Sequence, residues 1–203
     1  MIKYILAALG LGIVAGYLNN NYASLISNVW ISGYLLDFSL ILLLFVMGFM
    51  FGADKEAVPK MRKAGLRILG VPFSIALGSI VGGLVGGYLL GINVVGSMAV
   101  TAGFGWYTLA GPLVGQLLGA NLGALGFVVN FLRELLTILT IPLMVKLDRY
   151  APIASGGATT MDTTLPIIVR YCGSETLIVA FSSGFVLTVI APFTITAIVS
   201  LIH

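Results

Sequence analysis

Residues 155–166 read SGGATTMDTTLP, which places paired glycines, four threonines, an aspartate and a proline in one short run. The chain as a whole is strongly apolar, because 59% of the 203 residues are hydrophobic and only 8% are charged. A soluble domain carries about 25% charged residues, so a water-exposed globular protein is excluded. In lipid, unwound backbone is tolerated only inside protein or along a wet cavity. The run therefore predicts an interrupted membrane segment.

A second interruption is predicted at residues 101–112, which read TAGFGWYTLAGP within another apolar region. Pro112 lacks an N–H and suits the first turn of a helix, which predicts a half-helix that starts at Gly111. In both runs Gly and Thr precede a Pro, which suggests an inverted internal repeat, although no residue-level repeat is visible. Paired interruptions of this kind point to a transporter binding site at the middle of the membrane.

Each run also has a simpler interpretation. Residues 155–166 are alternatively an extramembrane loop in which Asp162 caps the next helix. Residues 101–112 are alternatively a kink in a continuous helix. The loop interpretation leaves the apolar residues 166–171 without a purpose, so two interrupted segments are the favoured prediction.

The fold predicted from these patterns is an all-α, polytopic membrane helix bundle with two discontinuous helices at the midplane. Each crossing needs about 20 apolar residues, so one transporter domain over residues 1–203 uses nearly the whole chain. Glycines at a spacing of four predict close helix packing. They fall at positions 12/16, 78/82/86, 83/87/91 and 111/115/119. The predicted spans are 4–18, 34–52, 68–90, 94–119 (broken), 123–145, 158–171 (broken or re-entrant) and 176–202.

Charge places the chain in a membrane with a defined orientation. Five of the ten basic residues lie within residues 53–67, and the positive-inside rule puts that loop in the cytoplasm. This predicts a multi-pass protein of the cytoplasmic (inner) membrane. A net charge of +3 is too small to indicate nucleic-acid binding. The single cysteine, Cys172, excludes an internal disulfide, and the single histidine, His203, is the last residue.

Glu134 is the acidic residue that solvation explains least, because it falls in the middle of the predicted span 123–145. A charge there costs at least about 2.5–3.5 kcal/mol on insertion scales, which makes it a functional hypothesis. Asn130 shares its helix face, whereas Arg133 projects about 100° away. With Asp162, Glu134 is predicted to form a site for an ammonium group, Na+ or a proton, since burial favours a protonated carboxyl. The alternative is a structural ion pair that joins Arg133 or Arg170 to one of the two acids.

Three runs resemble the LysO-type lysine exporter family of bacteria and archaea. They are GFGWYTLAGPLVGQLLG from Gly103, NFLRELLTILTIPL from Asn130 and SGGATTMDTTLPIIVRYCG from Ser155. The resemblance runs from the second predicted span to the C-terminus. It implies an inner-membrane transporter that exports L-lysine against an inward-moving proton. The two intramembrane acids regarded as essential in that family map onto Glu134 and Asp162.

Longer members of the family carry extra membrane segments before the region where this chain begins. The resemblance therefore implies one of three arrangements. A separate small membrane subunit supplies the missing helices, two copies of the chain associate, or the short form works alone.

The binding site predicted from these residues receives the ammonium of lysine at Glu134 or Asp162. The substrate carboxylate is expected at a half-helix N-terminus, near Gly111 or Thr163. No cofactor is predicted, and the coupling ion is a proton or sodium. Three alternatives stay open: a transporter of another amino acid or ion, a subunit active only with a partner, and an intramembrane enzyme, whose typical Gly-x-Gly-Asp setting is absent. The side chains predicted to donate hydrogen bonds are Asn130, Trp106, Tyr107, Thr108, Thr159, Thr160, Thr163 and Thr164.

Overall fold

The computed structural model describes residues 2–19 and 66–201, together with residues 21, 34, 35, 38, 39, 41, 42, 45, 46, 49, 53 and 59. The predicted second span at 34–52 and most of the basic loop at 53–67 therefore lie largely outside the described residues. The chain divides into two compact units, Met1–Leu42 and Leu43–His203.

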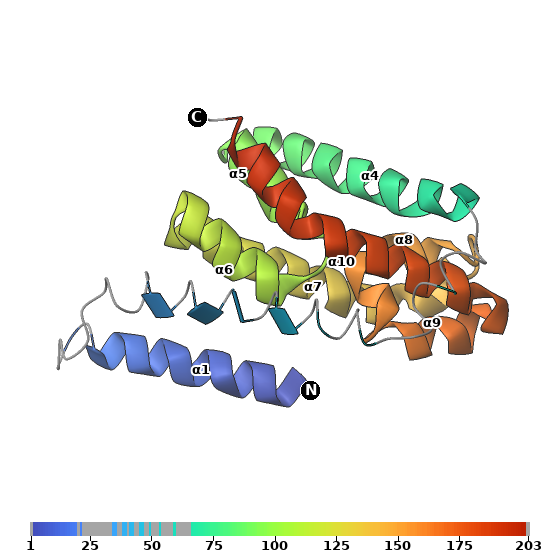
Figure 1. Cartoon of the computed structure of the whole chain (residues 1–203), viewed down its shortest axis with the longest axis horizontal. Coiled ribbons are helices and arrows are strands. Elements are labelled where there is room, and N and C mark those ends of the chain that lie inside the picture. Colours follow the sequence, from blue (N-terminus) through green and yellow to red (C-terminus); the bar gives the residue numbers. More distant parts are fainter. Residues whose placement is uncertain are drawn as a thin grey trace. The chain divides into compact units, whose positions relative to one another are not determined.

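In the first unit, helix α1 (Ile2–Leu18) is a run of 17 residues with no acidic residue in its first turn and no basic residue in its last (Figure 1). Apolar side chains on different sides of this helix, such as Leu11, Ile13 and Tyr17, are exposed. A helix that is apolar all round suits a membrane span better than the surface of a soluble protein.

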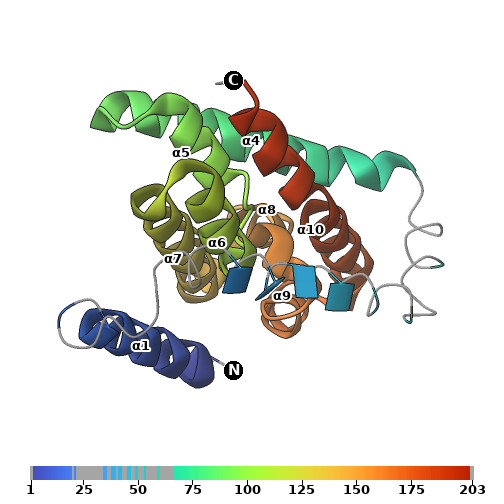
Figure 2. The ribbon, with the colours of Figure 1, turned by 60° about the vertical axis from the view of Figure 1, so that its left-hand side comes forward.

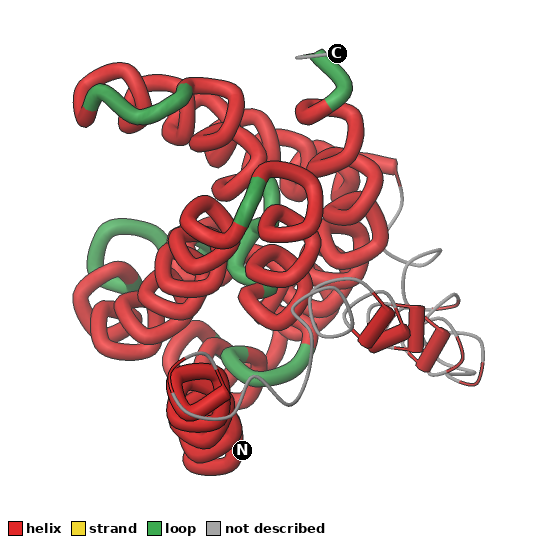
Figure 3. Tube along the Cα trace, turned by 90° about the vertical axis from the view of Figure 1, so that its left-hand side faces the viewer, coloured by secondary structure: helices red, strands yellow, loops and turns green. Residues whose placement is uncertain are grey.

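The described residues of the second unit form helices joined by short loops, with no strand among them, as Figure 3 shows. The prediction of an all-α membrane protein is confirmed. The 3₁₀ helices η3 and η4 interrupt the C-terminal half. The elements are α4 (Leu66–Leu90), α5 (Val94–Thr101), α6 (Tyr107–Leu118), α7 (Ala120–Met144), α8 (Ala151–Gly156), η3 (Gly157–Met161), α9 (Leu165–Cys172), η4 (Ser174–Thr176) and α10 (Leu177–Val199).

Three helices of the described part are long and apolar enough to cross a membrane. They cover Gly70–Leu90, Ala120–Met144 and Ser174–Val199. The shorter helices α5, α6, α8, η3 and α9 lie between these three in the sequence. They occupy the two regions where the sequence predicts interruptions, and each is too short to cross a membrane by itself.

Helices α6 and α7 lie side by side, as Figures 1 and 2 both show. A Cβ atom on Gly123 would lie 2.5 Å from the Cα atom of Gly115 and 2.9 Å from the carbonyl oxygen of Gly111. No side chain fits between the two backbones, so this glycine seam allows the closest helix contact in the way small residues do in membranes.

The other glycine repeats behave differently from one another. Gly83 and Gly87 face Ser97 of α5, and a Cβ atom on Gly87 would lie 2.6 Å from the Ser97 hydroxyl. The repeat at 78/82/86 on α4 and the pair at 12/16 on α1 have no described atom within 4 Å of the added Cβ. Close packing is therefore seen at only part of the predicted positions.

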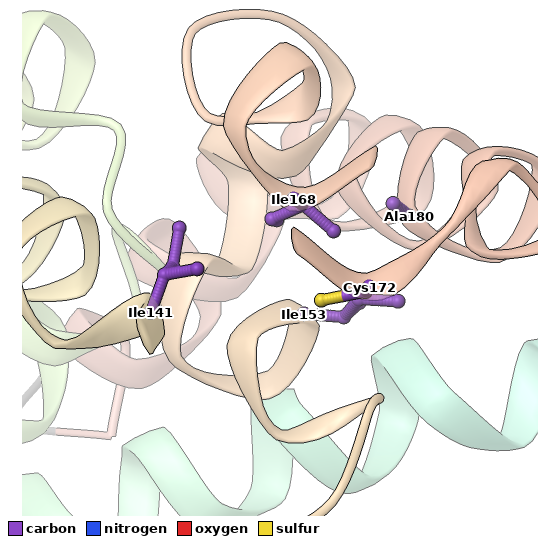
Figure 4. Packing of buried hydrophobic residues seen from close by; sticks show 5 residues of the cluster. All are labelled: Ile141, Ile153, Ile168, Cys172 and Ala180. Atoms are coloured by element: carbon purple, nitrogen blue, oxygen red, sulfur yellow. The ribbon is translucent and has the colours of Figure 1, made fainter. Parts of the chain in front are cut away.

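A buried cluster joins the C-terminal helices to α7. It consists of Ile141, Ile153, Ile168, Cys172 and Ala180, which come from α7, α8, α9 and α10 (Figure 4). The free thiol of Cys172 packs here as an apolar group. In lipid the stabilisation comes from close packing more than from exclusion of water. The cluster fixes the short helices α8 and α9 against two long helices.

Candidate functional site

The first interruption spans residues 102–106, between α5 and α6. Phe104 has a φ of 52° and Gly105 a φ of 100°, and two positive φ angles in succession end the α-helical path. Phe104 is fully buried, which holds a conformation that is costly for a non-glycine residue. A new helix then starts, with Trp106 at its N-cap position.

The prediction that this half-helix starts at Gly111 is wrong. Helix α6 starts at Tyr107, and Pro112 lies inside it. The physical reason is that the positive φ angles at Phe104 and Gly105 set the break, and these depend on contacts made elsewhere in the fold. Gly111 instead packs its Cα side against Phe127 of α7, where an added Cβ would lie 3.0 Å from the Phe127 Cβ.

Asn130 of α7 holds the first interruption in place. Its side-chain amide donates to the carbonyl oxygen of Val100 at 2.8 Å and to that of Gly126 at 2.8 Å. Its carbonyl oxygen accepts the N–H of Gly105 at 2.7 Å. Backbone groups freed by the break thus find partners inside the protein, as lipid requires. All three contacts of Asn130 go to backbone, which leaves this predicted substrate ligand occupied.

The second interruption spans α8, η3 and the turn before α9. Thr160 donates to the carbonyl oxygens of Gly157 and Ala180, each at 2.8 Å. Thr159 donates to the carbonyl oxygen of Gly156 at 2.9 Å. Both threonines are buried, and Thr160 ties η3 to α10. Residues 155–166 are therefore packed inside the helical unit and do not form a simple exposed loop.

The two interruptions meet. The N–H of Ala158 donates to the carbonyl oxygen of Phe104 at 2.8 Å, so backbone from each segment satisfies backbone of the other. Gly157 has a φ of 61°, and an added Cβ would collide with the Phe104 carbonyl oxygen. Gly105 faces the Gly156 carbonyl oxygen in the same way, at 3.1 Å from an added Cβ. Glycine is required at this crossing both for conformation and for space.

Glu134 lies beside this crossing, on α7. Its side chain is 3% exposed, and it interacts with the phenol of Tyr107, which donates a side-chain hydrogen bond to the carboxylate. Tyr107 itself packs edge-on against both Phe127 and Phe131, with ring centroids 5.4 Å and 5.6 Å away. Glu134 forms no ion pair among the residues that the structure describes. A buried acid without a charged partner is costly in a membrane span, which makes Glu134 a candidate site residue.

Asp162 follows η3 and is placed differently. Its side chain is exposed, and its carboxylate accepts the N–H of Thr163. The expectation that both acids are buried is therefore met by Glu134 only. Asp162 lies in the turn between two short helices, where the carboxylate turns back to the local backbone. The charges of both acids nevertheless act on Tyr107, which places the tyrosine near each of them.

A pocket of about 40 Å³ opens beside Asp162. A water molecule needs about 10–15 Å³ by this measure, so the pocket admits a few waters, a small cation or an ammonium head, and not a whole amino acid. Three lining residues, Ala158, Met161 and Thr188, were not predicted from the sequence. The signal for Thr188 is its position as a polar residue in the apolar run of α10, where it donates to the Met161 sulfur at 3.5 Å. The lining residues are Trp106, Ala158, Thr159, Met161, Asp162 and Thr188.

The remaining predicted ligands are dispersed. Thr108 is exposed on α6, and Thr164 is buried at the N-cap of α9, with its hydroxyl 3.4 Å from that of Thr159. The Thr163 side chain lies against the Asp162 carboxylate. Among the described residues, the buried hydroxyls of Ser182 and Ser183 of α10 have no hydrogen-bond partner, which is unusual because buried polar groups are nearly always hydrogen-bonded.

The alternative of an ion pair with Glu134 or Asp162 is not seen in the described part of the chain. Arg133 points to α4 and α8, and Arg170 is exposed at the end of α9. The salt bridge observed is Arg149–Glu175, at 2.8 Å on the exposed surface. Over the same residues there is no group of three His, Cys, Asp or Glu side chains that could hold a metal ion.

Comparison with known proteins identifies the family to which the chain is similar. A family model described as "Lysine exporter LysO" matches residues 6–199. The lysine exporter LysO of Escherichia coli (strain K12) is 30% identical over 161 residues, which cover 78% of this chain and 53% of that protein. The chain thus spans about half the length of that relative.

A second relative is similar over nearly its whole length. The putative lysine exporter of Haemophilus influenzae (strain ATCC 51907 / DSM 11121 / KW20 / Rd) is 30% identical over 192 residues, which cover 93% of each chain. No solved structure matches the chain.

Proposed function

Since the chain belongs to the lysine exporter LysO family, we propose that it exports L-lysine from the cytoplasm across the inner membrane. The family is one of transporters, and the proposed role is transport and not catalysis. We further propose that export is coupled to an inward-moving proton, which the acids of the site carry.

The buried carboxylate of Glu134 is the observation on which the proposal rests. It is 3% exposed within a helix long enough to span the membrane, and among the described residues it has no cationic partner. Burying such a group without a counter-ion is costly, and in membrane proteins it marks an ion or substrate pathway. Its Tyr107 partner is an uncharged phenol and leaves the carboxylate without a counter-ion.

The pocket beside Asp162 supports a second step. It has room for an ammonium head, and Asp162 supplies a carboxylate at its edge. Opposite charges attract, so in this proposal the side-chain ammonium of lysine is held there until a proton displaces it. In this mechanism the two acids alternate between binding the substrate and binding the proton.

Purified protein in lipid vesicles tests the proposal. Vesicles are loaded with labelled lysine, and the external solution is then made more acidic than the interior. We expect the release of lysine to accelerate with the imposed gradient. In Asp162→Asn we expect it to fall to the rate of lysine-loaded vesicles that contain no protein. If release does not respond to the pH gradient but responds to a sodium gradient, the coupling ion is sodium and not the proton. Absence of any lysine release would overturn the proposal.

The same vesicles address the remaining alternatives. Labelled arginine, ornithine and neutral amino acids, each tested alone, show whether lysine is the preferred cargo. Because no other protein is present, activity also shows that the chain, alone or as a self-associated pair, needs no small partner subunit.

A further inference from the structure

The guanidinium group of Arg133 projects from α7 about 100° away from the Glu134 carboxylate and contacts other elements. Its Nε donates to the carbonyl oxygen of Ser155 at 2.8 Å. One terminal nitrogen, Nη2, donates to the carbonyl oxygen of Ala154 at 3.1 Å, and the other, Nη1, donates to the Ser79 hydroxyl at 2.9 Å. The side chain therefore links α7 to the end of α8 and to the middle of α4.

These contacts leave the charge of Arg133 without a counter-ion. No carboxylate pairs with it in the part of the chain that the structure describes. A guanidinium has five N–H groups, and the three bonds above leave one free on each terminal nitrogen. A paired set of N–H groups matches a carboxylate, which accepts two parallel hydrogen bonds. An unpaired charge at membrane depth is costly unless it faces water or binds an anion.

A large pocket opens next to this group. Its volume is about 400 Å³, ten times that of the pocket beside Asp162 and within the range of about 300–1,000 Å³ for small-molecule sites. The Ser79 hydroxyl accepts from Arg133, so its own hydrogen remains to be donated into the pocket. Charge, hydroxyl and space thus combine at one place. The lining residues are Ser74, Ile75, Gly78, Ser79, Arg133 and Ala154.

We propose that Arg133 and Ser79 form a subsite for the α-carboxylate of the transported amino acid. This proposal rests on the proposed export function and adds a determinant of specificity to it. The acids at Glu134 and Asp162 select a cationic group, which a simple diamine also carries. The Arg133 subsite selects a free carboxylate, and so distinguishes an amino acid from an amine.

A purely structural role for Arg133 makes a different prediction. A cation at the last carbonyls of a helix stabilises that helix end, and Arg133 contacts two carbonyls at the end of α8. If that were its only role, changes near it would weaken the binding of lysine and of lysinamide alike. Lysinamide keeps both amino groups and lacks only the carboxylate, so the ratio of the two affinities separates the roles.

The test compares Ser79→Asp with its uncharged isostere Ser79→Asn. Aspartate at this position pairs with Nη1 of Arg133 and neutralises the subsite, while the contacts of Arg133 to α8 remain. Affinities of purified protein for lysine, lysinamide and 1,5-diaminopentane are measured by calorimetric titration. We expect wild type to prefer lysine over lysinamide at least tenfold, since a charge-assisted hydrogen bond contributes about 1.5–3 kcal/mol and 1.4 kcal/mol is tenfold. Ser79→Asn, which loses the hydroxyl but leaves the charge of Arg133 free, is expected to keep part of this preference.

In Ser79→Asp we expect this preference to fall to about onefold, the ratio for a site that ignores the carboxylate. A preference that persists in Ser79→Asp, or is lost equally in Ser79→Asn, would overturn the subsite while leaving lysine export intact. If Ser79→Asp does not fold, Ser74→Asp and Ser74→Asn give the same comparison. Ser74 lines the same pocket, and these variants leave the hydrogen bonds of Arg133 unchanged. A wild-type protein that binds no lysine overturns both the subsite and the export function.

Discussion

Arg133 and Glu134 are adjacent in the sequence but contact different neighbours of α7. Arg133 donates to the carbonyl oxygen of Ser155 at 2.8 Å, whereas Glu134 is buried against Tyr107. Successive side chains on a helix project about 100° apart, so the two charges do not neutralise each other. One helix thereby presents an anionic site to the α6 side and a cationic site to the α4 and α8 side.

Replacement of Glu134 by glutamine is expected to abolish lysine efflux. The amide keeps the shape of the side chain and its interaction with Tyr107, but it carries no charge and no exchangeable proton. Efflux from vesicles under a pH gradient measures the effect, and size-exclusion chromatography shows that the protein is folded. The matched control is Glu175→Gln, which removes an exposed acid outside the site and should retain the wild-type rate. Wild-type efflux in Glu134→Gln would exclude Glu134 from coupling.

Replacement of Asn130 by leucine is expected to destabilise the protein. It removes the hydrogen-bond partner of the Gly105 N–H, and a buried backbone group left unpaired costs about 1–3 kcal/mol. The carbonyl oxygens of Val100 and Gly126 lose one donor each but keep a backbone donor. The midpoint of thermal unfolding in detergent measures the loss. Thr140→Val on the same helix removes a hydroxyl that bonds only locally, to the Leu136 carbonyl oxygen and its own turn, and should change the stability by less than about 0.5 kcal/mol. Equal midpoints for the two variants would argue against a role for Asn130 at the break.

Replacement of Gly157 by alanine should cost more than the same change at Gly91. Both residues have positive φ angles, 61° and 64°, so both substitutions incur backbone strain on the order of 1–3 kcal/mol. Only Gly157 adds a collision, since its Cβ would meet the Phe104 carbonyl oxygen, whereas Gly91 has open space. Unfolding midpoints of the two variants give the comparison. A Gly91→Ala variant that is the less stable of the two would contradict the crossing of the two segments.

The Arg149–Glu175 ion pair is expected to contribute little. Its side chains are 53% and 59% exposed, and exposed pairs give coupling energies of about 0.2–1 kcal/mol. A double-mutant cycle with Arg149→Gln and Glu175→Gln, measured at low and at 1 M salt, should show a small coupling that salt screens. A coupling above about 2 kcal/mol that persists in salt would show that the pair is shielded from water in the membrane-bound protein.

Composition was sufficient to predict the all-α membrane fold. A chain with so few charged residues cannot form a water-exposed surface, so its surface must face lipid. Glycine and proline patterns located both departures from regular helix. They did not locate the start of α6, because that depends on a positive φ at Phe104, which no propensity favours. The conformation is stabilised by Asn130 and by the Ala158 N–H, both distant in the sequence.

The chemistry of the site was predictable in part for the same reason. A charge in mid-span identified Glu134 without any knowledge of its neighbours. The exposure of Asp162 and the direction of Arg133 depend on where α8 and η3 lie, and these short elements have no periodic pattern of their own. Thr160 shows that residue type alone does not identify a ligand. It was predicted to bind substrate, but its hydroxyl bonds to two carbonyl oxygens of the protein.

The glycine seam between α6 and α7 has a mechanical consequence. Backbones that touch at Gly115 and Gly123 leave no slack for sliding or tilting, so the two helices behave as one rigid body. Tyr107 and Glu134 are carried on that body, so in the proposed transport cycle they move together. Any relative displacement in that cycle then occurs between this body and the rest of the fold.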